Sequence, residues 1–206
     1  MKVNDNRKLY RSVYDMKPGI IEEIEIPALQ FIVQEGKGKL NSFGRPEEQY
    51  WAVWKTVNQL KRITKERNGY QFKLMPHEIV WYENIGGDAW SYSQMMQVPD
   101  LITFDMYEEA RASVVKRYRD ETVPSTKFVS VKQGFCIQKL HVGHYRESGK
   151  IVEDLKDYAA SKGYKVLDGR REVYLNPPEC YPSPDRWQTI VRLQVGTPNK
   201  EKSYAE

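Results

Sequence analysis

The chain has very few of the residues that hold disulfide-rich or metal-bound domains together. Two cysteines, Cys136 and Cys180, and three histidines occur among 206 residues. A chain of this length buries about 70% of the surface that it exposes when unfolded, so a hydrophobic core suffices without disulfides or a structural metal. His141 and His144 are three residues apart and have no evident acidic or cysteine partner. We therefore predict no metal site and no cofactor.

Long apolar runs are also missing. No segment approaches the roughly 18 consecutive apolar residues that a membrane-spanning helix needs. The first ten residues are polar and lack the apolar core of a secretory signal. These absences argue against a membrane protein and predict a cytoplasmic protein whose cysteines stay reduced.

The chain also lacks a large excess of either basic or acidic residues. Lys and Arg number 32 against 28 Asp and Glu, a formal net charge of +4. Acidic residues are interleaved with basic ones, as Glu66 is within residues 61–67, KRITKER, a pattern typical of a solvated helix end. A dedicated nucleic-acid-binding protein concentrates positive charge on one face, so we expect no nucleic-acid partner.

Aromatic residues are abundant, with 14 Tyr and 5 Trp, and many lie between Tyr50 and Tyr92. Such a cluster is typical either of an aromatic core or of an apolar pocket that carries polar groups at its edges. The pattern alone leaves both interpretations open.

The order of the expected elements repeats itself. Strand patterns cover residues 24–33, 72–82 and 90–98, with a helix that opens at Arg45 and ends near Gly69. After a charged helix over about 105–119, the same order returns as a strand within 128–142, a helix over 148–163 with Ser148 as its N-cap, and strands over 170–176 and 187–195. This indicates one domain over 1–206, built from two units of about 20–100 and 127–196. The predicted class is α+β: duplicated β-α-β-β units form a concave antiparallel sheet, backed by helices, around a central ligand pocket.

The second unit contains the carboxylate with the clearest chemical potential. Residues 77–82 and 171–175 occupy matching places, so we expect Glu78 and Glu172 to be equivalent. If Val173 faces the helices, alternation turns Glu172 and Tyr174 into the concave face, where Arg192 of the next strand would meet Glu172. Such a pair is either a solvated ion pair of small effect or part of a functional site. In the second case the carboxylate attracts a cationic or polarised ligand, or acts as a general base.

Several segments together resemble the GyrI-like small-molecule-binding domain. The two units carry the resemblance, with residues 136–145 (CIQKLHVGHY) and 171–175 (REVYL) ahead of 187–195. The free-standing branch of the family is closer still. It is similar at residues 9–10 (LY), 17–18 (KP), 26–28 (IPA) ahead of 36–38 (GKG), and 90–96 (WSYSQMM) ahead of 99–100 (PD).

This resemblance implies a pocket with a glutamate and aromatic walls that binds hydrophobic, often cationic compounds. Some free-standing members are hydrolases that open the cyclopropane ring of DNA-alkylating natural products, using the glutamate and a tyrosine to orient water. Glu172 lies at the place of that glutamate, and we expect Glu172 and Tyr145 to be catalytic. The expected ligand-binding residues are Trp81, Tyr82, Trp90, Tyr92, Met96, Tyr174 and Arg192.

Three departures from the family pattern bear on ligand choice. Arg170 and Arg171 stand where the family often has histidines, His144 replaces the proline of a Gly-Pro-Tyr motif, and residues 176–182 lack the usual Asp-Pro-Arg. The predicted function is to bind a planar, hydrophobic small molecule, cationic or electrophilic, and to hydrolyse cyclopropanoid genotoxins. The alternative is a non-catalytic protein that acts on a protein partner, as an inhibitor or protector of a larger enzyme.

Overall fold

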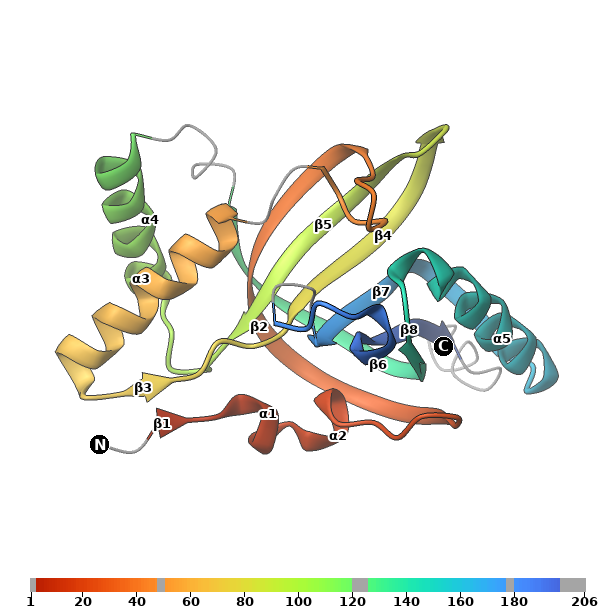
Figure 1. Ribbon diagram of the computed structural model, residues 1–206. Coiled ribbons are helices and arrows are strands. Elements are labelled where there is room, and N and C mark those ends of the chain that lie inside the picture. The colour runs from red at the N-terminus through yellow and green to blue at the C-terminus, as the bar shows by residue number, and fades with distance from the viewer. Residues whose placement is uncertain (1–2, 48–50, 120–125, 177–179, 197–206) are drawn as a thin grey trace, which may run out of the picture.

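The computed structural model describes residues 3–47, 51–119, 126–176 and 180–196. Six antiparallel strands close into a barrel, and helices pack on its outside (Figure 1). The barrel strands are β2 (Ile21–Lys39), β4 (His77–Gly86), β5 (Ala89–Val98), β6 (Thr126–Val142), β7 (Lys165–Asn176) and β8 (Gln188–Gly196). The longer helices are α3 (Trp51–Asn68), α4 (Phe104–Tyr118) and α5 (Ser148–Ser161). Short elements are β1 (Val3–Asn4), α1 (Asn6–Leu9), α2 (Arg11–Tyr14), β3 (Gln71–Phe72), and the 3₁₀ turns η2 (Tyr145–Glu147) and η3 (Pro184–Arg186).

The α+β class is confirmed, and the antiparallel sheet that was expected to be concave closes into a barrel. The strands follow the order β2-β5-β4-β7-β8-β6, and the long strands β6 and β2 close the ring by pairing with each other. The two halves use the same order, β2-β5-β4 and β6-β8-β7. A duplication would produce this order, and the duplication itself stays a prediction.

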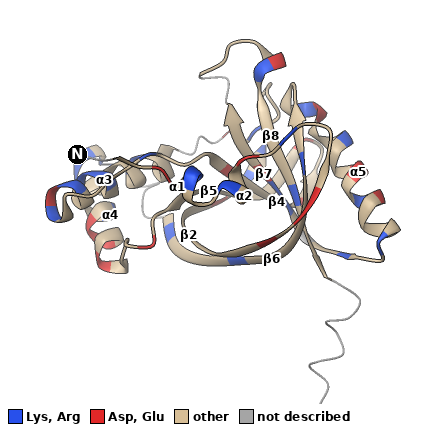
Figure 2. Ribbon diagram, turned by 90° about the horizontal axis from the view of Figure 1, so that it is seen from below, with Lys and Arg blue, Asp and Glu red and all other residues tan. Residues whose placement is uncertain are grey.

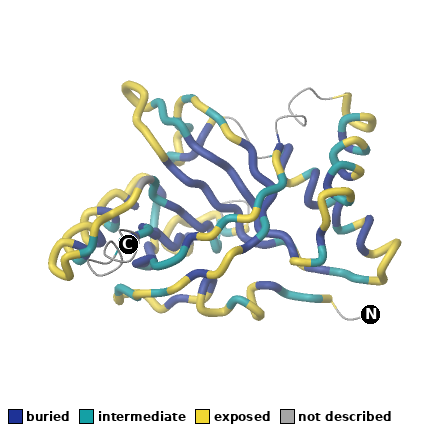
Figure 3. The backbone as a smooth tube through the Cα atoms, turned by 180° about the vertical axis from the view of Figure 1, so that it is seen from behind, coloured by how far each residue is buried: buried dark blue, intermediate teal, exposed yellow. Residues whose placement is uncertain are grey.

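The helices cover different parts of the barrel. Helices α3 and α4 pack together beside β2 and β5, whereas α5 covers β6, β7 and β8 (Figure 1). Buried residues follow the barrel strands, and exposed ones lie on the outer helices and at the tip of the β4–β5 hairpin (Figure 3). None of the described helices is long and apolar enough to cross a membrane. Basic and acidic residues are mixed along helices and strands (Figure 2).

The start of α3 differs from the prediction. Arg45 and Pro46 do not open the helix, because Pro46 forms an isolated bridge with Leu40. The described helix begins at Trp51, and Tyr50 lies outside the described residues. Val57 and Leu60 are buried as their spacing predicts, whereas Trp54 is 43% exposed.

The strand expected over 24–33 is longer than predicted, and Gly36, which belongs to the turn-like sequence Gly-Lys-Gly after it, lies inside β2, opposite Tyr92. A Cβ atom at position 36 would lie 2.5 Å from Cε2 of Tyr92. The glycine is therefore required by the approach of the Tyr92 ring to the β2 backbone. Tyr92 is itself buried against Trp81, so its ring has little room to move.

We predict that Gly36→Ala destabilises the fold by about 1–3 kcal/mol, the usual cost of overpacking a core. Gly38→Ala is the matched control, since its Cβ would lie 4.0 Å from the nearest atom, the Tyr92 hydroxyl oxygen. Urea unfolding of both variants measures the difference. Equal stabilities would show that the Tyr92 ring does not need the space at Gly36.

Candidate functional site

Strand register gathers most of the predicted site residues on one face of the sheet. Arg170, Trp81, Tyr92 and Gly36 form one row across β7, β4, β5 and β2. The next row holds Glu172, Ile79, Gln94 and Gln34, and the third holds Tyr174, His77, Met96 and Ile32. Directly paired residues share a face, and residues two apart along a strand share it as well. The site therefore consists of alternate residues from neighbouring strands.

An aromatic cluster occupies this face near α5. Trp81 contacts Trp90 and Tyr92 edge to face, at centroid distances of 6.1 and 5.9 Å. Tyr145 of η2 lies 4.8 Å from the Tyr174 ring and 4.9 Å from Trp187. The buried members of this cluster are Ile79, Trp81, Tyr92, Tyr145, Tyr174 and Trp187.

Glu172 is buried within this cluster, with 2% of its side chain exposed. Its Oε2 accepts hydrogen bonds from the Trp81 indole at 3.0 Å and from the Tyr174 hydroxyl at 2.6 Å. Its Oε1 accepts from the Ser148 hydroxyl at 2.9 Å. A buried carboxylate needs such donors to offset its lost hydration.

Ser148 is a residue whose role the sequence did not predict. We expected it to be the N-cap of α5, but Glu147 holds that position and makes no side-chain cap. The Ser148 hydroxyl instead turns to Glu172, so the first turn of α5 holds the carboxylate in place.

Arg170 covers Glu172 on the side that faces the cleft. Its Nε lies 3.5 Å from Oε1 of Glu172. Its guanidinium carbon lies 5.6 Å from the Trp81 ring centroid and 5.5 Å from that of Trp90, within cation–π range. Arg170 is thus at once the ion-pair partner of Glu172 and a cation bound by two tryptophans.

A cleft of about 340 Å³ opens beside Arg170, between the sheet and α5. Trp81, Tyr82 and Trp90 form its aromatic wall, and Glu153 and Lys156 of α5 stand on the other side. Tyr82 is 53% exposed at the rim, and its hydroxyl lies 3.1 Å from Ser93 Oγ. The cleft is large enough for a planar ligand of a few rings.

Two predicted site residues lie elsewhere. Arg192 pairs with Arg171, while Glu172 pairs with Val191, so Arg192 and Glu172 point to opposite faces. The expected contact between Glu172 and Arg192 is therefore wrong. Met96 shares the face of Glu172 but is 3% exposed in the main core rather than in the aromatic cluster.

Glu78 and Glu172 are not equivalent as expected, because their side chains lie on opposite faces of the sheet. Glu78 pairs with Val173, whereas Glu172 pairs with Ile79. Adjacent strand residues point in opposite directions, so Glu78 faces the barrel interior and Glu172 faces α5. The expectation that Val173 faces the helices and Glu172 the opposite side is therefore wrong, since Val173 lies in the main core.

A second group of polar residues backs the aromatic cluster. Nη2 of Arg45 lies 3.1 Å from Nδ1 of His77, and the His77 ring stacks on Tyr174 at 5.7 Å. Burial, with the nearby positive charge of Arg45, holds the pKa of His77 well below its usual value. Burial and the neighbouring Glu172 raise the pKa of Tyr174 well above 10, so its hydroxyl keeps its proton near neutral pH.

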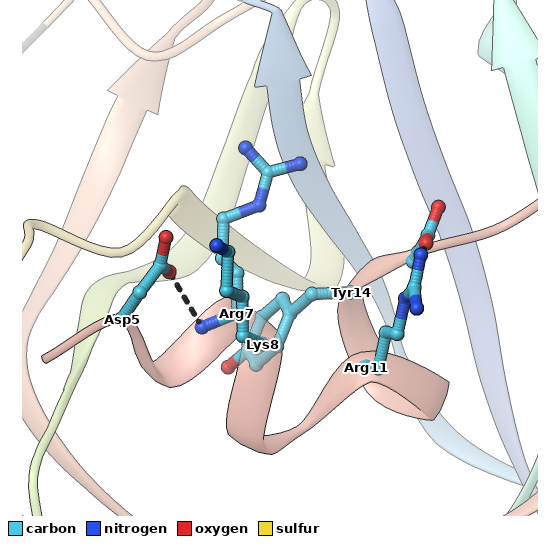
Figure 4. A pocket seen from close by; sticks show the side chains of 6 residues that line it. Asp5, Arg7, Lys8, Arg11 and Tyr14 are labelled. Atoms are coloured by element: carbon cyan, nitrogen blue, oxygen red, sulfur yellow. Dashed lines mark hydrogen bonds and ion pairs between the residues drawn. The ribbon is translucent and has the colours of Figure 1, made fainter.

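A wider depression of about 570 Å³ lies along α1 and α2, lined by Asp5, Arg7, Lys8, Arg11, Tyr14 and Asp15 (Figure 4). Its charges are of both signs, and Arg11 pairs with Asp15 in solvent. None of the predicted site residues lines it. We therefore take the aromatic cleft as the candidate site.

The described residues form no metal-binding group, and the buried cysteine is unreactive. No three His, Cys, Asp or Glu side chains among the described residues are grouped so that they could hold a metal ion. The two cysteines are free; Cys136 is buried, and burial raises the pKa of its thiol to about 11. Such a thiol carries little thiolate and is a poor nucleophile.

Solved structures with a similar fold exist. An uncharacterized conserved protein from Listeria innocua is 24% identical with a TM-score of 0.81, and a hydrolase from Listeria innocua is 24% identical with a TM-score of 0.80. Each alignment covers 95% of this chain and all of the other. The EcmrR C-terminal domain is 14% identical with a TM-score of 0.57, over 86% of this chain and 98% of that one. These likenesses concern the fold, and they are consistent with a GyrI-like fold. No protein-family model and no curated protein sequence matches the chain.

We predict that His77 makes the fold less stable in mild acid. The unfolded state takes up a proton near pH 6.5, whereas folded His77 resists protonation. Stability is therefore full above about pH 6.5 and falls below it, by up to about 1.4 kcal/mol per pH unit.

Urea unfolding at pH 7.5 and 5.0 measures this loss in the wild type and in His77→Gln, whose amide can still accept from Arg45. We expect the variant to lose less stability on acidification than the wild type. His144→Gln is the control, at a partly exposed histidine. An equal loss in wild type and His77→Gln would contradict the prediction.

Proposed function

We propose that the chain binds a planar, hydrophobic and uncharged electrophile in the aromatic cleft, as a cytoplasmic member of the free-standing GyrI-like branch. One observation carries the proposal: Arg170 lines the cleft, lies over Trp81 and Trp90, and contacts Glu172. The single domain over 1–206 and the duplication of its two halves are part of the same proposal, supported by the common strand order.

The position of Arg170 favours an uncharged ligand over a cationic one. In a pocket for cations, the glutamate and the aromatic faces would both be open to the ligand. Here the guanidinium of Arg170 occupies both and neutralises the carboxylate. A ligand cation would have to displace Arg170 and would meet its repulsion.

The same arrangement supports ring-opening hydrolysis of a cyclopropane that is conjugated to a carbonyl group. Water attacks a ring carbon, the carbon–carbon bond breaks, and its electron pair moves to the carbonyl oxygen. Glu172 would take the proton of the attacking water, and Arg170 would donate to the oxygen that becomes negative. The proton then passes to the product, so the reaction consumes one water and needs no cofactor.

The hydroxyl group that contacts Glu172 differs from the one that the sequence predicted. We expected Tyr145 in that role, but the hydroxyl that reaches Glu172 is that of Tyr174, at 2.6 Å. Tyr145 packs on the Tyr174 ring. We propose that Tyr174 orients Glu172, with Tyr145 as the support for its ring.

We predict that Glu172→Gln slows hydrolysis of a cyclopropanoid alkylating compound by about 10²–10⁴-fold, the usual contribution of a general base. Binding of the planar ring-opened product should largely survive, because the aromatic wall is unchanged. Chromatography of the ring-opened alcohol measures the rate.

The matched control is Glu153→Gln, at an exposed carboxylate in the same cleft. We expect it to keep the wild-type rate. A wild type no faster than buffer would remove the catalytic proposal. If no planar compound binds at all, the alternative of a protein partner gains support.

We predict that Arg170→Met raises the affinity for the planar cation ethidium about tenfold. The variant exposes Glu172 and two tryptophan faces, and cation–π contacts in desolvated sites contribute on the order of 1–2 kcal/mol. The affinity for neutral pyrene should change little. Fluorescence titration measures both probes.

Lys156→Met removes a positive charge from the same cleft without contact to Glu172 and serves as the control. If Lys156→Met raises ethidium affinity as much as Arg170→Met does, net charge rather than the position of Arg170 governs selectivity. Tight ethidium binding by the wild type would contradict the proposal of an uncharged ligand.

A further inference from the structure

A second set of charged residues lies inside the barrel, on the face opposite to Glu172. Glu78 is fully buried, and Arg171 and Arg192 are 8% and 1% exposed. They project inward from β4, β7 and β8, among the apolar side chains of the main core. This interior group takes no part in the aromatic cleft.

The hydrogen bonds of Glu78 satisfy one of the two arginines. Its Oε2 accepts from Nη1 of Arg171 at 2.7 Å, and its Oε1 accepts from the Tyr14 hydroxyl at 2.8 Å. Burial and the adjacent Glu78 raise the pKa of Tyr14 well above 10, so the tyrosine is a neutral donor. Glu78 and Arg171 therefore form one neutral pair.

Arg192 binds neutral acceptors in this group. It donates to the Gln138 and Gln133 side-chain oxygens at 3.0 and 3.1 Å, and to the Val13 carbonyl at 2.8 Å. The half-buried Glu22 carboxylate accepts from Nε2 of Gln138 rather than from an arginine. Arginine keeps its proton in proteins, so the interior group carries one positive charge in excess.

A cavity of about 70 Å³ lies between the two arginines. The other residues that line this cavity include Gln133, Gln194, Lys132 and Cys136. The Cys136 thiol is neutral, since burial raises its pKa to about 11, and therefore does not balance the charge.

Gln133 supplies an independent sign of a missing acceptor. It is 5% exposed, and its Nε2 has no hydrogen-bond partner among the described residues. Because its Oε1 accepts from Arg192, the orientation of the amide is fixed and Nε2 cannot exchange places with it. A buried amide nitrogen without an acceptor is unfavourable, because the hydrogen bond that it made to water is not replaced.

We propose that this cavity binds a small monovalent anion, of the size of chloride, bromide or nitrate, between Arg171, Arg192 and Nε2 of Gln133. The anion balances the excess positive charge and accepts the bond that Gln133 has to offer. A volume of about 70 Å³ holds a few water-sized spheres, so it suits such an ion and excludes a planar ring system. The site is therefore distinct from the aromatic cleft and does not depend on the proposed function.

The first test compares thermal unfolding in sodium chloride, sodium nitrate and sodium gluconate at equal ionic strength. Gluconate is too large for the cavity, whereas chloride and nitrate are small enough to enter it. The gluconate salt therefore shows the stability of the protein without a bound anion. At ten times its dissociation constant a bound anion should raise the melting temperature by about 3–6 °C.

Gln133→Glu is the decisive variant, because its carboxylate places a negative charge beside Arg192 permanently. We expect its melting temperature in gluconate to equal or exceed that of the wild type in chloride, with no further effect of chloride. Gln71→Glu, on β3 outside the barrel, is the matched control and should respond to chloride as the wild type does.

A bromide soak of wild-type crystals tests the position without any variant. Anomalous scattering should place bromide between Arg171, Arg192 and Gln133. An absence of bromide there, with equal melting temperatures in chloride and gluconate, would overturn the proposal. A chloride effect that persists in Gln133→Glu would also overturn it, since the anion would then act elsewhere.

Discussion

The register between β4 and β7 is the constraint on which the rest of the structure depends. These strands join the two halves of the barrel, with Ile79 opposite Glu172 and Glu78 opposite Val173. Because successive strand residues face opposite sides, this register sends Glu172 under α5 and Glu78 into the barrel. A slip of one residue would exchange the faces of a whole strand and separate each carboxylate from its donors.

Two neighbouring arginines form ion pairs that depend on this register. Arg170 reaches Glu172 on the outside, and Arg171 reaches Glu78 on the inside. Removing one partner of a buried ion pair costs about 3–5 kcal/mol, because the other charge is left unpaired. A change of register would break both pairs and leave Glu172 and Glu78 without these partners. Their opposite directions also separate the aromatic cleft from the interior cavity.

Much of the fold follows from local patterns. The hydrophobic periods predicted the strands and helices of both halves, since alternation and helical spacing depend on which residues must be buried. Local patterns do not fix the ends of an element where a long-range contact decides them. Gly36 reads as a turn residue, and only the Tyr92 ring explains it as a strand residue. Ser148 reads as a helix cap, and only Glu172 explains where its hydroxyl points.

The sequence by itself determined the α+β class, the alternation within each strand, and most of the aromatic residues near Glu172, although Trp187 was not among those predicted. It also contained Arg170 and Arg171, but it did not show which carboxylate each would meet. Tertiary structure decided that Arg192 lies away from Glu172, that Tyr174 rather than Tyr145 reaches it, and that the sheet closes. The physical reason is that period-two alternation defines faces only within one strand. The faces of different strands are matched by their register, which depends on pairings between residues far apart in the chain.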